Sequence, residues 1–192
     1  MNSFEAVNIL DLVSAIGENA VTSILSDFLC SKNAEIENFV KHSALEFAKR
    51  KMSITYLVID KNGELAAIFT LTHKAIQLTN NDLSASMRKK IERHSKLDEQ
   101  SNSYMISSFL IAQFGKNEQH ENEIEGSKLM EMAMNILAGI QREIGGSVVY
   151  LECEDNPKLL TFYGNEKNRF KVFGERYSDK EQIKYIQLLR IF

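Results

Sequence analysis

The most chemically suggestive pattern in the chain is a strand, a loop and a helix start near its centre. An apolar run predicts a strand over Tyr104–Phe114, and a loop at Glu118–Glu125 leads into a regular amphipathic helix over Gly126–Arg142. Free backbone N–H groups and the positive end of the helix dipole meet at such a helix start, and both attract anions. The glycine that begins the helix lets a ligand approach the backbone closely. Ser127 and Lys128 could add a hydroxyl donor and a positive charge, so the pattern predicts a phosphate site.

The same segment also has an ordinary structural interpretation. Gly126 could simply begin a helix, with Glu123 and Glu125 as acids that favour the positive end of the dipole. Together with Glu121, these acids would also place negative charge where a phosphate should lie. Each such like-charge contact near a surface costs on the order of 1 kcal/mol. Positive charge from the neighbouring lysines could offset this repulsion.

The elements that must position this site follow from the apolar pattern along the rest of the chain. Six further strands are expected, at Phe4–Leu12, Ser53–Ile59, Glu64–Thr72, Ser147–Glu152, Arg169–Phe173 and Ile183–Ile191. Further helices are expected from Asn19 to Phe28, from Ile36 to Lys51, within the polar stretch Thr79–Ser103, and at Pro157–Gly164. Asn62-Gly63 predicts a tight hairpin turn, and the last two strands are plausible as a second hairpin. This order predicts an α/β (α+β) domain with a mixed sheet and helices on both faces.

Composition limits the class of protein. The chain has 192 residues, a formal net charge of -3 and 44% apolar residues, which suits one domain over residues 1–192. Two distant cysteines, Cys30 and Cys153, suggest no disulfide framework and favour a reducing, cytoplasmic location. No apolar run is long enough to cross a membrane, and the start lacks the pattern of a signal peptide. The four histidines show no metal-ligand spacing, so no metal is expected.

Several segments, in this order and spacing, resemble the GNAT family of N-acetyltransferases. They are LIAQFGKN (Leu110–Asn117), IEGSKL (Ile124–Leu129), YLECEDN (Tyr150–Asn156) and FY (Phe162-Tyr163). The segments Lys32–Asp60 and Gly63–Thr72 resemble the N-terminal half of proteins of this family. The resemblance covers nearly the whole chain. It implies the GNAT fold, a mixed, mostly antiparallel twisted sheet of about six to seven strands with helices on both faces. It also implies a V-shaped cleft for acetyl-CoA between the strands at Tyr104–Phe114 and Ser147–Glu152.

The same resemblance assigns roles to individual residues. Phe114 and Lys116 would offer backbone groups to the pantetheine arm of acetyl-CoA. The pyrophosphate would lie on the loop and helix start, at Glu121, Glu125, Gly126, Ser127 and Lys128. Asn156 matches the asparagine that contacts the pantetheine arm. Tyr163 matches the general acid to the leaving thiolate, and Phe162 would pack beside it.

The chain departs from the family pattern at the phosphate loop. The family loop reads Gln/Arg-x-x-Gly-x-Gly/Ala, whereas these positions hold Glu121, Ile124 and Gly126, so that only the last glycine is kept. Two of the other matches have structural alternatives as well. Asn156 before Pro157 is a good helix N-cap, and Tyr163 could be a core aromatic residue.

The expected activity is the transfer of an acetyl group from acetyl-CoA to a primary amine. The amine would attack the thioester directly, with both substrates held together. A carboxylate acting through water, or water alone, would take the proton; Glu152 and Glu154 are near the right strand end, and neither is assigned. The sequence does not name the acceptor, and the last strand, ending at Phe192, could pair with a second subunit in a homodimer.

Two other functions remain open. A toxin-like GNAT would acetylate the amino group of aminoacyl-tRNA and be neutralised by a partner protein, and the hairpin Thr55–Thr72 and Tyr163 resemble such toxins. RNA binding needs basic surface, and this acidic chain has one modest basic cluster, Arg88–Lys90 with Arg93 and Lys96, so this function ranks second. That cluster is otherwise an ordinary solvated helix face. The other alternative is an inactive GNAT acting as a binding module, which the altered phosphate loop favours.

Overall fold

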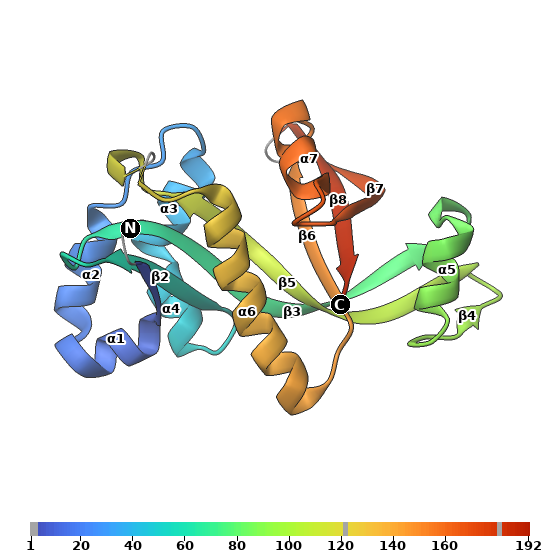
Figure 1. The fold of residues 1–192 in the computed structure, drawn as a ribbon, viewed down its shortest axis with the longest axis horizontal. Coiled ribbons are helices and arrows are strands. Elements are labelled where there is room, and N and C mark those ends of the chain that lie inside the picture. Colours follow the sequence, from blue (N-terminus) through green and yellow to red (C-terminus); the bar gives the residue numbers. More distant parts are fainter. Residues whose placement is uncertain (1–3, 121–122, 180–181) are drawn as a thin grey trace. The chain divides into compact units, whose positions relative to one another are not determined.

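The computed structural model describes residues 4–120, 123–179 and 182–192 (Figure 1). The chain divides into two compact units, one of residues 1–72 and 111–137 and the other of residues 73–110 and 138–192. The strands are β1 (Phe4–Asn8), β2 (Ile54–Asp60), β3 (Leu65–Thr79), β4 (Leu97–Asp98), β5 (Ser103–Lys116), β6 (Val148–Glu154), β7 (Lys171–Ser178) and β8 (Ile183–Ile191). The helices are α1 (Ile9–Ile16), α2 (Glu18–Ser26), α3 (Ala34–His42), α4 (Ala44–Lys49), α5 (Ala85–Ile91), α6 (Gly126–Ile144) and α7 (Pro157–Gly164).

The strands follow the order β1-β2-β3-β5-β6-β8-β7, and β4 pairs with β5 outside this path. Among the pairings with a defined register, β5 with β6 is parallel and the others are antiparallel. This confirms the predicted mixed, mostly antiparallel sheet. The described residues form eight strands rather than six or seven, because β4 is only two residues long and leaves no pattern in the sequence. The prediction of a single domain over residues 1–192 stays a prediction.

Two predicted elements of the first unit are wrong in their extent. The expected strand Phe4–Leu12 ends at Asn8, because the side chain of Asn8 accepts a hydrogen bond of 2.9 Å from the Leu10 amide and starts α1. The expected helix from Ile36 to Lys51 is two helices, α3 and α4, which meet at Ser43 with a non-helical φ of -126°. At Asn8, the helix-capping side chain therefore ends the strand, although the apolar pattern continues beyond it.

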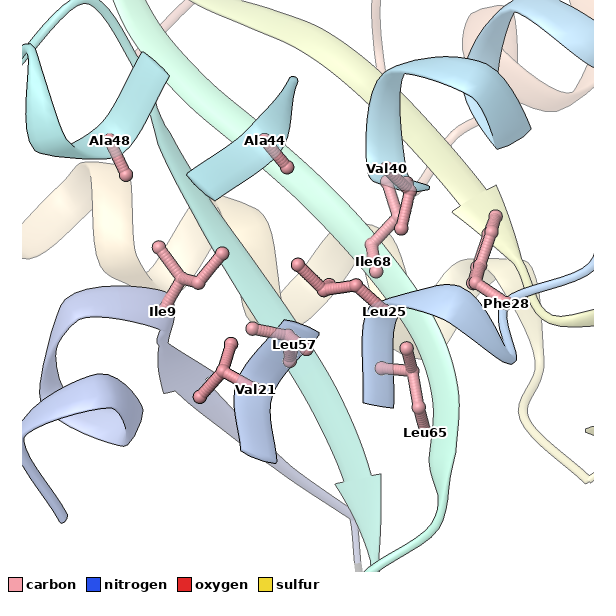
Figure 2. Packing of buried hydrophobic residues seen from close by; sticks show 10 residues of the cluster. All are labelled: Ile9, Val21, Leu25, Phe28, Val40, Ala44, Ala48, Leu57, Leu65 and Ile68. Carbon is pink, nitrogen blue, oxygen red and sulfur yellow. The ribbon is translucent and has the colours of Figure 1, made fainter. Parts of the chain in front are cut away.

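The core of the first unit lies between helices α1–α4 and the strands β2 and β3 (Figure 2). Leu57 and Ile68 on the strands are fully buried, as are Ile9, Val21 and Val40 on the helices. The chain turns from β2 to β3 at the predicted Asn62-Gly63. Only Gly63 has a positive φ, of 85°, so the turn is not the two-residue type I′ turn, which needs positive φ at both residues. The helices and the hairpin therefore stabilise each other through one apolar layer.

The second unit has its own core. Buried residues of β3, α5, β5, β6 and β8, together with Leu83 from the turn before α5, form it: Ile76, Leu78, Leu83, Ile91, Tyr104, Ile106, Val148, Tyr150 and Leu189. Strands β7 and β8 form the predicted hairpin. Gly146, just before β6, has a φ of +108°, and a Cβ atom there would lie 2.8 Å from the ring of Phe109. The chain leaves α6 at a position where only glycine fits.

A homodimer through the last strand stays a prediction. In β8, Ile183–Leu189 pairs with β7 and Tyr185–Ile191 pairs with β6. Most of this strand is therefore paired within the chain, whereas strand addition needs a free edge. In the described part of the chain, no helix is long and apolar enough to cross a membrane.

The apolar core of the first unit should dominate the stability of that unit. Ile68→Ala, at a fully buried position, should lower the free energy of unfolding by about 2–5 kcal/mol, because it removes buried methyl groups and leaves a cavity. Ile144→Ala, at a residue 75% exposed, should change it by no more than about 0.5 kcal/mol. Urea denaturation followed by circular dichroism measures both, and equal midpoints for the two variants would contradict this assignment of the core.

Candidate functional site

The start of α6 keeps two backbone amides available. The amides of Lys128 and Leu129 both donate to the carbonyl of Glu125, at 3.0 and 3.1 Å. Among the residues that the structure describes, none accepts a hydrogen bond from the amides of Gly126 and Ser127. These are the N–H groups that a helix start offers to an anion.

The acidic side chains beside this helix start contact neighbouring side chains of the protein. Glu123 lies 3.1 Å from Nδ1 of His120, whose Nε2 lies 3.5 Å from Glu64. The Glu125 carboxylate accepts a hydrogen bond of 3.0 Å from the Ser127 hydroxyl, and Lys128 pairs with Glu131 at 3.3 Å. Ser127 and Lys128 therefore contact neighbouring acids in this structure. Glu121 lies outside the described residues.

The loop that leads to α6 is anchored by Asn117, a residue to which the sequence pattern assigned no role. Its side chain is 3% exposed. Its Nδ2 donates to the Leu65 carbonyl at 2.8 Å, and its Oδ1 accepts from the Leu29 amide at 3.3 Å. Its backbone amide also donates to the Ala66 carbonyl at 2.8 Å. The sequence signal that could have identified Asn117 is a polar residue at the end of a long apolar strand. In the structure, this residue fixes where β5 ends and the loop begins.

The predicted residues on β5 lie directly before this anchor. Phe114 and Lys116 are in the last three residues of the strand, and both are half-buried. Gly115 between them is close to α3, because a Cβ atom there would lie 3.1 Å from Cγ2 of Ile36. The first unit thus holds the predicted residues Phe114, Lys116, Glu125, Gly126, Ser127 and Lys128.

The second unit holds the other three predicted residues on or next to α7. Asn156 is the N-cap of this helix, and its Oδ1 accepts a hydrogen bond of 2.9 Å from the Lys158 amide. The structural interpretation of Asn156 is therefore correct. Within the described residues, its Nδ2 donates no hydrogen bond, so a contact to a ligand remains compatible with its cap role.

Tyr163 is the most buried of the predicted residues on α7, with 7% of its surface exposed. Its ring lies 5.0 Å from that of Phe162 and 6.1 Å from that of Phe170, both edge-on. Burial raises the pKa of its hydroxyl, and the nearby Cys153 raises it further. Tyr163 is therefore protonated near neutral pH, as a hydrogen-bond donor must be.

Cys153 on β6 is not an activated nucleophile. The side chain is buried, and burial together with the charges of Asp155 and Glu154 raises the pKa of its thiol to about 11. A thiol with such a pKa holds little thiolate at neutral pH, and the thiolate is the reactive form.

Glu152 is part of a polar network and is poorly suited to act as a base. Arg176 donates to Oε2 of Glu152 at 2.7 Å and to Oε1 at 3.2 Å, and Tyr150 and Gln187 also donate to this carboxylate. Burial alone would raise the pKa of Glu152, but these hydrogen bonds outweigh burial and lower it to about 2. A carboxylate with such a pKa takes up a proton only in strong acid. Among the described residues, no group of side chains has the composition of a metal site.

The chain is similar to known proteins in fold rather than in sequence. No protein-family model matches the chain, and no characterised protein is significantly similar to it in sequence. A tyrosine-to-phenylalanine mutant of the KacT protein is similar in structure with a TM-score of 0.66 at 14% identity, covering 99% of this chain and 94% of that one. A mutant AtaT toxin bound to the C-terminus of the antitoxin AtaR and to acetyl-CoA has a TM-score of 0.59 at 15% identity, covering 100% and 93%. AtaT complexed with acetyl-methionyl-tRNAfMet has a TM-score of 0.60 at 14% identity, covering 96% and 94%.

These structures show the fold. They match nearly the whole length of this chain and of their own chains. The GNAT fold predicted from the sequence is therefore confirmed. The predicted roles of individual site residues stay predictions.

The Glu152 network should make folding stability depend on pH. The pKa of Glu152 is about 2 in the folded chain, against an ordinary value of 4.5. Because folding lowers this pKa, the network contributes stability that is fully present above about pH 4.5 and is lost as the pH falls toward 2. Glu152→Gln cannot ionise, so its urea midpoint should depend less on pH between about 5 and 3 than that of the wild type. Glu143→Gln, at an exposed residue, is the matched control, and equal slopes for Glu152→Gln and wild type would contradict this account.

Proposed function

We propose that this chain is an acetyl-CoA-dependent N-acetyltransferase whose acceptor is the amino group of an aminoacyl-tRNA. The observation that carries the proposal is the likeness over nearly the full chain to AtaT, once bound to acetyl-CoA and an antitoxin fragment and once complexed with acetyl-methionyl-tRNAfMet. The net acidic charge of the sequence ranked this acceptor second. The likeness in fold reverses that order.

The residues present at the start of α6 are compatible with the pyrophosphate of acetyl-CoA. The amides of Gly126 and Ser127 would bind its oxygens, since no described residue uses them. The absence of the family's other loop glycine is tolerable in this interpretation, because Ile124 is buried and packs the loop. Phe114 and Lys116 would offer main-chain groups to the pantetheine arm, and Asn156 would offer its Nδ2.

The chemistry then requires little of the protein beyond positioning and one proton donor. Bound acetyl-CoA supplies the thioester that the acceptor amine attacks. Tyr163 would hold its proton at Oη and donate to the sulfur that leaves, with Phe162 and Phe170 packed around its ring. Glu152 is withdrawn as a candidate base because of its low pKa. A cytoplasmic location, a homodimer and an antitoxin-like partner protein are parts of the same proposal.

Gly126→Asp tests the pyrophosphate site. An aspartate at this position should weaken acetyl-CoA binding at least about tenfold, because its carboxylate repels the pyrophosphate. It should leave folding intact, since an acid in the first turn suits the helix dipole. Gly139→Asp is the matched control, because it lies on the exposed face of the same helix and a Cβ atom there meets nothing within 4 Å. Calorimetry measures both, and tight binding by Gly126→Asp or no binding by the wild type would refute the site.

Tyr163→Phe tests the proton donor. The turnover number for acetylation of an aminoacyl-tRNA should fall by about 10²-fold or more, while acetyl-CoA binding stays within about twofold. Tyr177→Phe, which removes a hydroxyl from a ring that is 55% exposed on β7, should retain wild-type turnover. The assay follows transfer of labelled acetyl to tRNA charged with methionine. Full activity of Tyr163→Phe would show that Tyr163 is only a core residue.

A further inference from the structure

A cavity in the second unit has four basic residues among the eleven that line it. It has a volume of about 530 Å³, within the range of ligand sites in proteins. Its lining comes from α5, from the turn after α7, and from β7 and β8. Four positive side chains line it, those of Lys90, Arg169, Lys171 and Arg190, against the single acid Glu166. The cavity is therefore locally cationic although the chain as a whole is acidic.

The basic side chains of this cavity differ in their partners from the other cations of the β7–β8 hairpin. In the described part of the chain, none of the four forms an ion pair with a carboxylate. Other cations of the same hairpin do have such partners, since Arg176 pairs with Glu152 and Lys184 with Glu175. The unpaired charge is thus concentrated in the cavity rather than spread over the hairpin.

Arg190 is the least exposed of the four basic residues that line the cavity. It is half-buried, and burial together with the nearby Arg169 lowers the pKa of its guanidinium. Its Nη1 donates to the Asn168 carbonyl at 3.1 Å, which uses one of its donors and leaves others available. Two guanidinium groups that repel each other in a partly buried place gain from a bound anion between them.

Arg169 is held toward the cavity by a strained turn. Its φ of +57° is in the left-handed region, which is unfavourable for a residue other than glycine. Its amide donates to the Asn165 carbonyl at 2.8 Å. The same turn is tied to the helix of the predicted proton donor, because Nδ2 of Asn168 donates to the Phe162 carbonyl at 2.7 Å. The cationic cavity and Tyr163 therefore lie at two ends of one hydrogen-bonded turn.

We infer that this cavity binds a phosphate of the RNA acceptor, with Lys90, Arg169, Lys171 and Arg190 as its ligands. The inference rests on the proposed function and adds to it the surface that holds the acceptor. Guanidinium groups match phosphate geometry with two parallel donors, and lysines add point charge. The apolar part of the lining, Met87, Leu189 and Ile191, leaves room for the sugar beside the phosphate.

This assignment also divides the basic cluster of α5 into two roles. Arg88 donates to the carbonyls of Asn80 and Leu83, at 3.1 and 3.4 Å, so it stabilises the turn before the helix. Lys90 alone of this cluster lines the cavity. Lys89 is exposed on the same helix and does not line it, and it provides a matched control.

The test compares the double variant Lys90→Gln/Arg169→Asn with the control Lys89→Gln/Lys167→Gln. Asparagine tolerates positive φ, so the turn should keep its conformation without the charge. Fluorescence anisotropy with labelled tRNA at several salt concentrations gives the dissociation constant and its salt dependence. The cavity variant should bind about tenfold or more weakly, and the slope of log K against log salt should fall by roughly 0.7–0.9 for each phosphate that it no longer neutralises. The control should bind as the wild type does.

Two further readouts separate the cavity from the active site. Acetyl-CoA affinity by calorimetry should be unchanged in both variants, and in the transfer assay the cavity variant should raise KM for aminoacyl-tRNA more than it lowers kcat. If no variant or wild type transfers acetyl but tRNA affinity still depends on the cavity, the proposed enzyme fails and the RNA site stands. Wild-type tRNA affinity and slope in the cavity variant would overturn the inference. So would tight binding of free AMP without any effect of the variant on tRNA, because the site would then serve a free nucleotide.

Discussion

Backbone groups that leave water must find hydrogen-bond partners inside the protein, and Asn117 meets this need where β5 ends. One buried side chain satisfies a carbonyl of β3 and an amide after α2, while its own amide pairs with β3 again. The position at which the strand stops therefore depends on this residue. A helix start can serve as an anion site only if its amides are presented reproducibly, and this anchor fixes the chain of the same unit ahead of α6.

Asparagine does similar work in the second unit. Asn156 caps α7, the Oδ1 of Asn165 accepts from the amides of Lys167 and Asn168, and the side chain of Asn168 closes the turn onto the end of the helix. Short polar side chains thus replace regular secondary structure on both sides of the predicted proton donor. These hydrogen bonds hold the turn in place of a disulfide, since Cys30 and Cys153 form none.

Helix α6, the hairpin β2–β3 and helix α7 could be predicted from the sequence, because an apolar period, an Asn-Gly turn and a proline at a helix start are local signals. The start of α1 could not, since it depends on the side chain of Asn8, which competes with a continuous apolar pattern. The break between α3 and α4 could not either, since Ser43 makes no side-chain cap and leaves no sequence signal. The resemblance to the GNAT family named candidate residues in both units. It could not reveal Asn117 or the partners of Glu152, because the contacts of a buried polar group come from strands far apart in the sequence. Net charge was a poor guide to the acceptor, because it averages over a surface on which acidic and basic residues are unevenly distributed.

Gly146 restricts how this protein can change. The ring of Phe109 fills the space that a side chain would need, and the backbone has a conformation that other residues rarely adopt. Most residues on the exposed face of α6 can vary freely. At position 146, by contrast, a side chain would have to displace the ring of Phe109. Phe109 belongs to β5, which forms with β6 the only parallel strand pair with a defined register among the described residues. In a library of random variants, position 146 should therefore be among the least tolerant in the chain, although it carries no chemistry of its own.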